Sequence, residues 1–163
     1  MVSTSKDRIS DTSRSWINLA GVLIALGVAF LLTILITHPA ETTKSFTPLS
    51  GLMTLKSMAA EAMSYEDAIA APNPTLLEFY ADWCTTCQSM SSTIADLHQQ
   101  YGDNINFVML DIDDPQWANQ IADYGASGVP QFTLLDAHHA EIKTWVGKVP
   151  KPILANFFDQ LLR

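Results

Sequence analysis

Two cysteines separated by two residues are the part of the sequence best suited to chemistry. They are Cys84 and Cys87, the only cysteines in the chain, and they belong to the run WCTTC at 83–87. An apolar run of strand length at 75–80 precedes them, and a helix-like run over 84–101 follows. A Cys-x-x-Cys pair at a strand-to-helix junction is typical of thiol–disulfide exchange.

The two thiols are expected to have different roles. Residues i and i+3 share one face of a helix, so the two sulfurs can close a small disulfide ring. Cys84 falls in the first turn, where unpaired backbone N–H groups and the positive end of the helix dipole favour a thiolate. This position predicts that Cys84 is the attacking sulfur. Cys87 lies one turn deeper, and we expect it to be the shielded, resolving thiol that releases the reduced partner.

Three other interpretations of the pair are a zinc half-site, a purely structural disulfide and two buried thiols. Zinc usually takes four ligands, and His98, His138 and His139 do not form a second Cys/His pair at finger spacing. A disulfide that closes so short a loop constrains little of the unfolded chain. The sequence therefore favours redox chemistry, and it predicts no metal and no cofactor.

Residues 16–37 form an apolar segment without a charged side chain. As a helix, these 22 residues would be about 33 Å long, enough to cross the apolar core of a bilayer. A secretory signal peptide is the alternative, but its apolar core is usually shorter, and no small-x-small cleavage site directly follows residue 37. The sequence predicts an uncleaved transmembrane helix between a cytoplasmic tail at 1–15 and a linker at 38–57.

Basic residues near the segment 16–37 predict its orientation. Lys6, Arg8 and Arg14 precede it, whereas Lys44 alone lies close behind it. By the positive-inside rule, the N-terminus is cytoplasmic and the C-terminal domain lies across the membrane. That side is where thiol–disulfide exchange must be actively managed.

The C-terminal part of the chain is acidic. Residues 64–163 contain thirteen Asp or Glu and four Lys or Arg, a net charge of −9, compared with −8 for the whole chain. This charge disfavours binding to nucleic acid or to an anionic membrane surface. We interpret it as a solvated acidic surface that keeps the domain soluble.

Hydrophobic periodicity predicts an α/β fold for residues 58–163, with strands and helices in the order β-α-β-α-β-β-α after a short first helix. This order gives a mixed central sheet with helices on both faces. The expected strands are 75–80, 105–110, 128–135 including its entering loop, and 141–146, and the expected helices are 64–71, 84–101, 113–124 and 150–162.

From about residue 58 to 163, the chain resembles thioredoxin. The matching stretches are LEFYADWCTTC at 77–87, DID at 111–113, YG at 124–125, GVP at 128–130 and VG at 146–147. With its YADWCxxC motif and its predicted anchor, the chain resembles the membrane-anchored, lumen-facing thioredoxin-like proteins of the cyanobacterial and chloroplast TxlA type. The same motif is similar to that of the exported thioredoxin-like domain of the DsbD reductase.

The resemblance implies a thiol–disulfide oxidoreductase in a thylakoid lumen or a periplasm. Such proteins take electrons from a membrane thiol transporter, CcdA-like or its DsbD counterpart. These proteins pass the electrons to oxidised thiol proteins outside the cytoplasm, including those needed for cytochrome maturation or assembly. A disulfide-forming oxidase or isomerase is an alternative, because the sequence does not fix the direction of electron flow. Another alternative is a non-catalytic, tethered assembly chaperone that uses the groove at 129–130.

The resemblance also implies roles for single residues. Cys84 matches the nucleophile and Cys87 the resolving cysteine. Pro130 matches a proline that is cis in the family, an isomer that only X-Pro bonds adopt cheaply, and the backbone of Val129 would pair with an extended substrate segment. Glu78 matches a buried acid, usually Asp, that moves a proton to or from the resolving cysteine, and desolvation would raise its pKa. The alternatives are an ordinary trans turn proline and a solvent-facing Glu.

The remaining site residues flank or separate the cysteines. Trp83 is expected to shield the sulfurs and to offer a flat contact surface, with a core aromatic as the alternative. Thr85 and Thr86 stand where ordinary thioredoxin has Gly-Pro, a pair that tunes the reduction potential. Met109 stands where many thioredoxins have Lys beside the buried acid, and loss of that charge would leave Glu78 easier to protonate. Both departures indicate a specialised carrier.

Overall fold

The computed structural model describes residues 47–163. The predicted tail at 1–15, the predicted transmembrane helix at 16–37 and the first part of the predicted linker lie outside the described residues. Between residues 47 and 163, no helix combines the length and the apolar character that a membrane crossing requires.

Four strands form one mixed sheet in the order β2-β1-β3-β4. The central strand β1 (Thr75–Tyr80) runs parallel to β2 (Asn106–Asp111) and antiparallel to β3 (Gln131–Leu135), which pairs antiparallel with β4 (Glu141–Val146). All six residues of β1 are buried, and a strand covered on both faces is expected to be almost continuously apolar. The predicted strands are confirmed, although β2 begins one residue later than expected.

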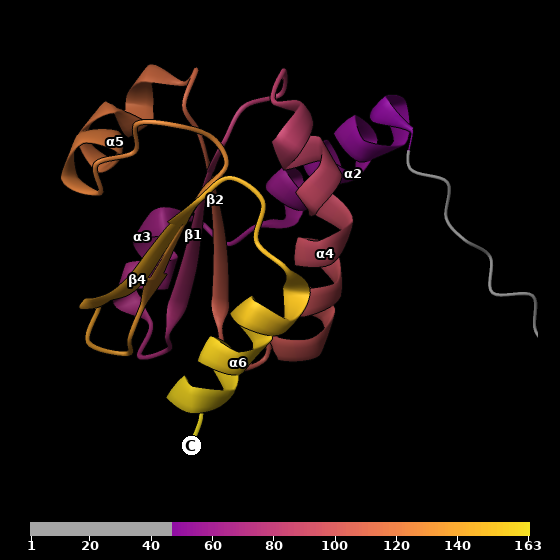
Figure 1. Ribbon diagram of the computed structural model, residues 1–163. Helices are drawn as coiled ribbons and strands as arrows, with labels where there is room; N and C mark the ends of the chain where they lie inside the picture. Colours follow the sequence, from indigo (N-terminus) through magenta and orange to yellow (C-terminus); the bar gives the residue numbers. More distant parts are fainter. Residues whose placement is uncertain (1–46) are drawn as a thin grey trace, which may run out of the picture. The chain divides into compact units, whose positions relative to one another are not determined.

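Helices cover both faces of the sheet (Figure 1). Helices α4 (Thr85–Tyr101) and α6 (Lys151–Leu161) pack on one face, and α3 (Tyr65–Ala70) and α5 (Ala118–Asp123) pack on the other. The predicted α/β fold, a mixed sheet flanked by helices, is therefore confirmed for the described residues.

The segment between β2 and β3 starts with a capped turn. Asp114 accepts a hydrogen bond from the backbone N–H of Gln116 at 3.0 Å and caps a short 3₁₀ helix, η1 (Pro115–Trp117). Trp117 has φ −92° and ψ 9°, outside the helical region, and α5 begins at the next residue. The structure therefore divides the single helix predicted over 113–124 into two helices, η1 and α5.

The structure differs from the sequence prediction at the N-terminal end of the domain. Residues 48–57, predicted as part of the linker at 38–57, belong to helix α2 (Pro48–Glu61), so the fold begins earlier than the predicted boundary at 58. Helix α2 packs along α4 (Figure 1). It therefore belongs to the same folded body as the cysteine pair.

Capping and packing explain why residues that suggest a linker form α2. The Thr47 side chain accepts the backbone N–H of Ser50, and the Ser50 side chain accepts the backbone N–H of Thr47. This reciprocal pair satisfies two backbone donors that the first turn leaves open. Leu55 is fully buried and packs against the cluster that contains both cysteines. Serine and threonine thus start a helix that one deeply buried leucine anchors.

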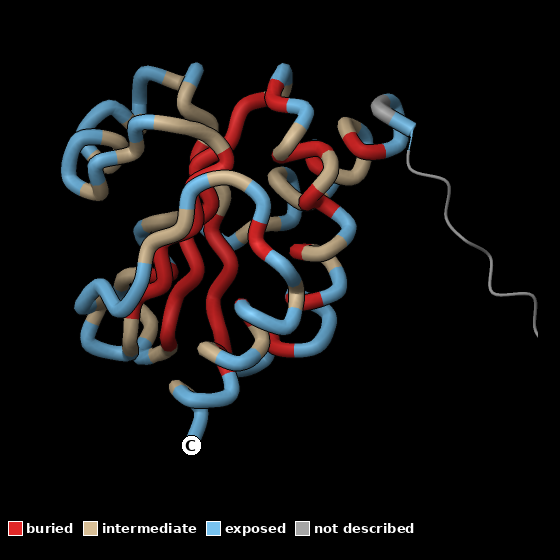
Figure 2. Tube along the Cα trace, in the orientation of Figure 1, coloured by how far each residue is buried: buried red, intermediate tan, exposed pale blue. Residues whose placement is uncertain are grey.

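The alternation of side chains along β1 decides which residues reach the cysteine pair. Successive side chains of a strand point to opposite faces. Leu77 and Phe79 pack under α3 and α5, whereas Leu76 packs under α4 and α6. Figure 2 shows buried positions along the central strands, and β1 and β3 are buried over their whole length. The same alternation places Glu78 on the face that α4 covers, between Leu76 and Tyr80.

Candidate functional site

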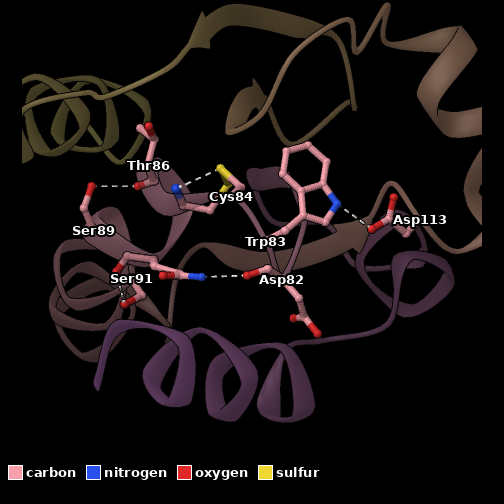
Figure 3. Close-up of a disulfide and its surroundings, with 9 residues drawn as sticks. Asp82, Trp83, Cys84, Thr86, Ser89, Ser91 and Asp113 are labelled. Carbon is pink, nitrogen blue, oxygen red and sulfur yellow. Dashed lines mark hydrogen bonds between the residues drawn. A yellow bond between two sulfur atoms is a disulfide. The ribbon is translucent and has the colours of Figure 1, made fainter. Parts of the chain in front are cut away.

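Cys84 and Cys87 form a disulfide at the N-terminus of α4 (Figure 3). Their Cα atoms are 5.2 Å apart, an ordinary separation for a disulfide. Cys84 is the N-cap residue, and its Sγ accepts the backbone N–H of Cys87 at 3.0 Å. That N–H is one of the unpaired donors of a first helical turn, and it would stabilise a thiolate on Cys84 in the reduced protein.

The two sulfurs differ in their access to solvent. Cys84 is 5% exposed and Cys87 is fully buried. An attacking thiol must reach a partner protein, whereas a resolving thiol needs to reach only the first sulfur. The structure therefore favours Cys84 as the nucleophile and Cys87 as the resolving cysteine, the order that the sequence predicts.

The loop before β3 lies beside the disulfide. The Val129–Pro130 peptide bond is cis, as the resemblance to thioredoxin implies, and the trans alternative is wrong. Val129 packs against the buried cluster that contains both cysteines. The N–H of Gly147, just after β4, donates to the Pro130 carbonyl at 2.7 Å, and a φ of +85° at Gly147 favours glycine there. This bond ties the end of β4 to the cis-proline loop.

Trp83 is 63% exposed, so the alternative of a core aromatic is wrong. Its Nε1–H donates to Oδ2 of Asp113 at 2.8 Å, which holds the indole beside the disulfide (Figure 3). A second exposed apolar side chain, Val146, lies against Gly128 next to the cis-proline loop and is 61% exposed. The site therefore presents apolar surface that a partner protein can cover.

The turn between β1 and α4 is held by polar contacts. The carbonyl of Asp82 accepts a hydrogen bond from Nε2 of Gln88 at 2.7 Å, and the Asp82 carboxylate forms an ion pair with Lys56 of α2. Thr85 is exposed, and the carbonyl of Thr86 accepts the Ser89 hydroxyl at 2.8 Å. The predicted tuning of the potential by the two threonines stays a prediction.

Glu78 is buried, with 1% of its surface exposed, and the solvent-facing alternative is wrong. Neither of its carboxylate oxygens has a hydrogen-bond partner among the described residues. Desolvation by burial raises the pKa of Glu78 from 4.5 to about 8. Met109 connects this acid to the disulfide, because it pairs in register with Glu78 and packs against the cluster of both cysteines.

The structure separates the candidate metal ligands. His98 lies on α4, whereas His138 and His139 lie in the turn between β3 and β4. Across residues 47–163, no three His, Cys, Asp or Glu side chains gather as a metal site would need. The cysteines are joined to each other, so the geometry fits a redox pair.

Sequence reasoning misses two contacts of the site. The sequence places Asp113 at the start of the predicted helix 113–124, yet this residue accepts the indole N–H of Trp83, which is 30 residues away. Lys56 falls in the predicted linker, yet it pairs with Asp82 beside the cysteines. Neither contact has a local sequence signal, because both depend on how distant elements meet.

Comparison with protein families identifies the fold of this site. The thioredoxin family model matches residues 56–160. The chain is 39% identical over 140 residues to the thiol:disulfide interchange protein TxlA of Synechococcus elongatus, covering 86% of this chain and 70% of that protein. It is 41% identical over 101 residues to the chloroplastic thioredoxin-like protein HCF164 of Oryza sativa, covering 62% of this chain and only 38% of that protein.

Solved structures give the same result. A mutant thioredoxin from Halobacterium salinarum is 26% identical with a TM-score of 0.53, and the match covers 60% of this chain and 83% of that one. The germline-specific thioredoxin Deadhead of Drosophila melanogaster is 25% identical with a TM-score of 0.52, covering 60% of this chain and 90% of that one.

Proposed function

Because the chain belongs to the thioredoxin family, as a thiol–disulfide oxidoreductase of the TxlA and HCF164 type, we propose that it reduces disulfides of proteins outside the cytoplasm. The observation that carries this proposal is the disulfide at the start of α4, in which Cys84 keeps 5% exposure and Cys87 is fully buried.

The proposed reaction begins with the reduced pair. The Cys84 thiolate attacks one sulfur of the substrate disulfide, and that S–S bond breaks as a new one forms between Cys84 and the substrate. The first substrate thiolate leaves and takes a proton from water. Cys87 then attacks the Cys84 sulfur, and the second substrate thiolate leaves. Two electrons pass to the substrate, and the pair is left as the Cys84–Cys87 disulfide.

Glu78 is proposed to handle the proton of Cys87. A thiol is a poor nucleophile until it is deprotonated, and Cys87 is fully buried, so bulk water does not reach it. The Glu78 carboxylate can accept this proton, because its pKa of about 8 is close to that of a thiol. When a membrane protein re-reduces the disulfide, Cys87 must take up a proton again.

The substrate is proposed to lie across the cis-proline loop. Trp83 and Val146 supply exposed apolar contacts, and the backbone of Val129 would pair with an extended segment of the partner. The acidic charge of residues 64–163 disfavours nucleic acid as a partner. Proteins with an accessible disulfide are therefore the proposed substrates.

The location and the electron donor are further parts of the proposal. The apolar segment 16–37 would anchor the chain, and the three basic residues before it favour a cytoplasmic N-terminus, with the domain in a thylakoid lumen or a periplasm. The resemblance to TxlA-type proteins supports a CcdA-like membrane thiol transporter as the donor. It also supports cytochrome maturation or assembly as the process served.

Trapping of mixed disulfides tests this function. In the full chain expressed in cells, Cys87→Ser should accumulate covalent adducts with exported proteins, because the first attack occurs and resolution does not. These adducts should disappear on treatment with dithiothreitol. Cys84→Ser is the matched control and should form no such adducts.

Two outcomes would contradict the proposal. If Cys84→Ser captures the same proteins as Cys87→Ser, the attacking sulfur is assigned wrongly. If a chain with both cysteines replaced by serine still supports assembly of the captured proteins, the protein acts as a tethered chaperone. The oxidase and isomerase alternatives are decided by the reduction potential of the pair.

A further inference from the structure

A small pocket lies between α2, α4 and the strands β1 and β2. Its lining is largely apolar, with Met58 and Ala62 contributed by α2 and its C-cap and Ile94 by α4. Of its lining residues, Glu78 and His98 are the two whose side chains titrate. The space open to the centre of a water molecule is about 10 Å³, close to the minimum of roughly 10 Å³ that one water needs.

The inner end of the pocket holds a carboxyl group that must exchange protons. Both oxygens of Glu78 are buried and lack a hydrogen-bond partner among the described residues. A group that accepts a proton from Cys87 in each cycle must release it before the next one. At that stage a substrate covers Trp83 and the cis-proline loop, so the face of the disulfide is closed to water. The pocket offers the proton on Glu78 a second route to solvent.

The outer end of the pocket holds an imidazole. His98 is an exposed residue, and its ring packs on Phe107 with centroids 4.9 Å apart. A Cβ atom at Gly102 would lie 2.8 Å from Cδ2 and 3.1 Å from Nε2 of His98, so the glycine leaves room for the ring in this position. Imidazole is the side chain best suited to pass protons at neutral pH.

We propose that His98 is the outlet of a proton path that starts at Glu78 and crosses the pocket through one water molecule. This inference rests on the proposed function. The Glu78 carboxylic acid gives its proton to the pocket water, which passes one to a ring nitrogen of His98. The imidazolium then releases a proton to solvent, and Glu78 is again a carboxylate. His98 touches neither sulfur and acts through Glu78, so it is a positioning residue for proton transfer.

Other ionisable groups near this path do not line the pocket. On α2, Lys56 is paired with Asp82, and Glu61 accepts the Ser57 hydroxyl at 3.0 Å. On β1 and β2, the neighbouring groups are Tyr80 and Asp111, and a hydrogen bond from the N–H of Asp113 at 3.0 Å occupies Asp111. His98 is thus the titratable side chain placed at the mouth of the pocket.

The test is the steady-state rate at which the full chain, re-reduced by dithiothreitol in each cycle, reduces a model protein disulfide between pH 6 and 8. His98→Ala should slow the reaction roughly three- to tenfold, less than the roughly 10²-fold of direct general acid–base catalysis, because the group acts one step away. Imidazole added to the buffer should restore the rate. His138→Ala, in the exposed turn between β3 and β4, is the matched control and should keep the wild-type rate.

Two further variants separate proton transfer from a structural effect. Ala62→Leu should fill the pocket and slow the reaction, and imidazole should not restore the rate because no water can then connect it to Glu78. In a Glu78→Gln background, His98→Ala should cause no additional loss, since both residues serve one path.

The outcomes distinguish this inference from the function on which it rests. If the wild-type chain reduces the disulfide and His98→Ala has the same rate and pH profile, the path is wrong and the proposed function stands. A loss in His98→Ala that imidazole does not restore also overturns the path, because a structural defect would explain it. If the reduced wild-type chain does not reduce the disulfide, the proposed function itself fails.

Discussion

The two faces of strand β1 are buried to the same extent but are built differently. On the face under α3 and α5, Leu77 and Phe79 are fully buried among other apolar side chains. On the face under α2 and α4, Glu78 is buried just as deeply, with no hydrogen-bond partner among the described residues. A buried carboxyl without a partner lowers stability, whereas buried leucine and phenylalanine raise it.

This difference separates the part of the molecule that maintains the fold from the part that performs chemistry. The apolar face needs only to exclude water. On the face of Glu78, burial raises the pKa of an acid without a partner to about 8, which is what the proposed proton transfer requires.

The largest effect is expected at Cys84. Cys84→Ser should abolish disulfide reduction by the full chain, because a hydroxyl cannot form the mixed disulfide. Phe79→Ala, on the opposite face, should instead lower the free energy of unfolding by about 3–5 kcal/mol, and the molecules that remain folded should keep their turnover. Turnover and urea denaturation of both variants measure this. Residual turnover in Cys84→Ser would contradict the assignment of the nucleophile.

Glu78 should make stability depend on pH. Its pKa is about 8 in the folded protein and near the ordinary 4.5 in the unfolded chain, so folding takes up a proton between these values. The free energy of unfolding should therefore fall as pH rises from about 4.5 to 8, by at most about 5 kcal/mol, and should then level off. Denaturation at a series of pH values measures this slope.

Glu78→Gln should remove most of that slope and should be more stable than wild type at pH 8. The control is Glu66→Gln, an exposed acid in α3 on the opposite side of the sheet. It should leave the slope unchanged. A wild-type protein whose stability rises between pH 5 and 8 would contradict the buried, unpaired state of Glu78.

Helix α2 should stabilise the face of Glu78 through Leu55. Leu55→Ala should cost about 2–5 kcal/mol, because the residue is fully buried in the cluster of the two cysteines. Leu49→Ala in the same helix should change stability by less than about 0.5 kcal/mol, because Leu49 is 68% exposed. Thermal or urea unfolding of the two variants compares them, and equal losses would show that α2 is not packed as described.

The smallest effect is expected from the hydrogen bond between Trp83 and Asp113. Both groups lie near solvent, and Asp113→Ala should cost about 1 kcal/mol or less in the interaction that orients the indole. The expected result is a few-fold rise in KM for a protein disulfide with little change in kcat. Asp103→Ala, at another exposed acid, is the control. A larger effect on kcat than on KM would contradict a role in substrate contact.

The sequence is sufficient for the features with a local signal. The apolar run of β1, the Cys-x-x-Cys pair and the helix that follows it each follow from the spacing of residue types, and the structure has them where predicted. The cis bond before Pro130 and the burial of Glu78 follow from the resemblance to thioredoxin.

The features that sequence reasoning misses depend on contacts between distant elements. Helix α2 contains serine, threonine, proline and glycine, and its stability comes from packing on α4, which the sequence of α2 alone does not reveal. The pocket that joins Glu78 to His98 needs α2, α4 and the sheet together. A histidine on the solvent side of a helix gives no sign that a buried acid lies at the other end of such a space.

The reduction potential of the Cys84–Cys87 pair tests the central claim most directly. The full chain, purified in detergent because residues 16–37 are apolar, would be equilibrated with mixtures of reduced and oxidised glutathione. A protein that reduces disulfides outside the cytoplasm should have a potential near the roughly −270 mV of thioredoxin. A value near about −120 mV, that of a strong disulfide-forming oxidase, would contradict the proposed direction of electron flow.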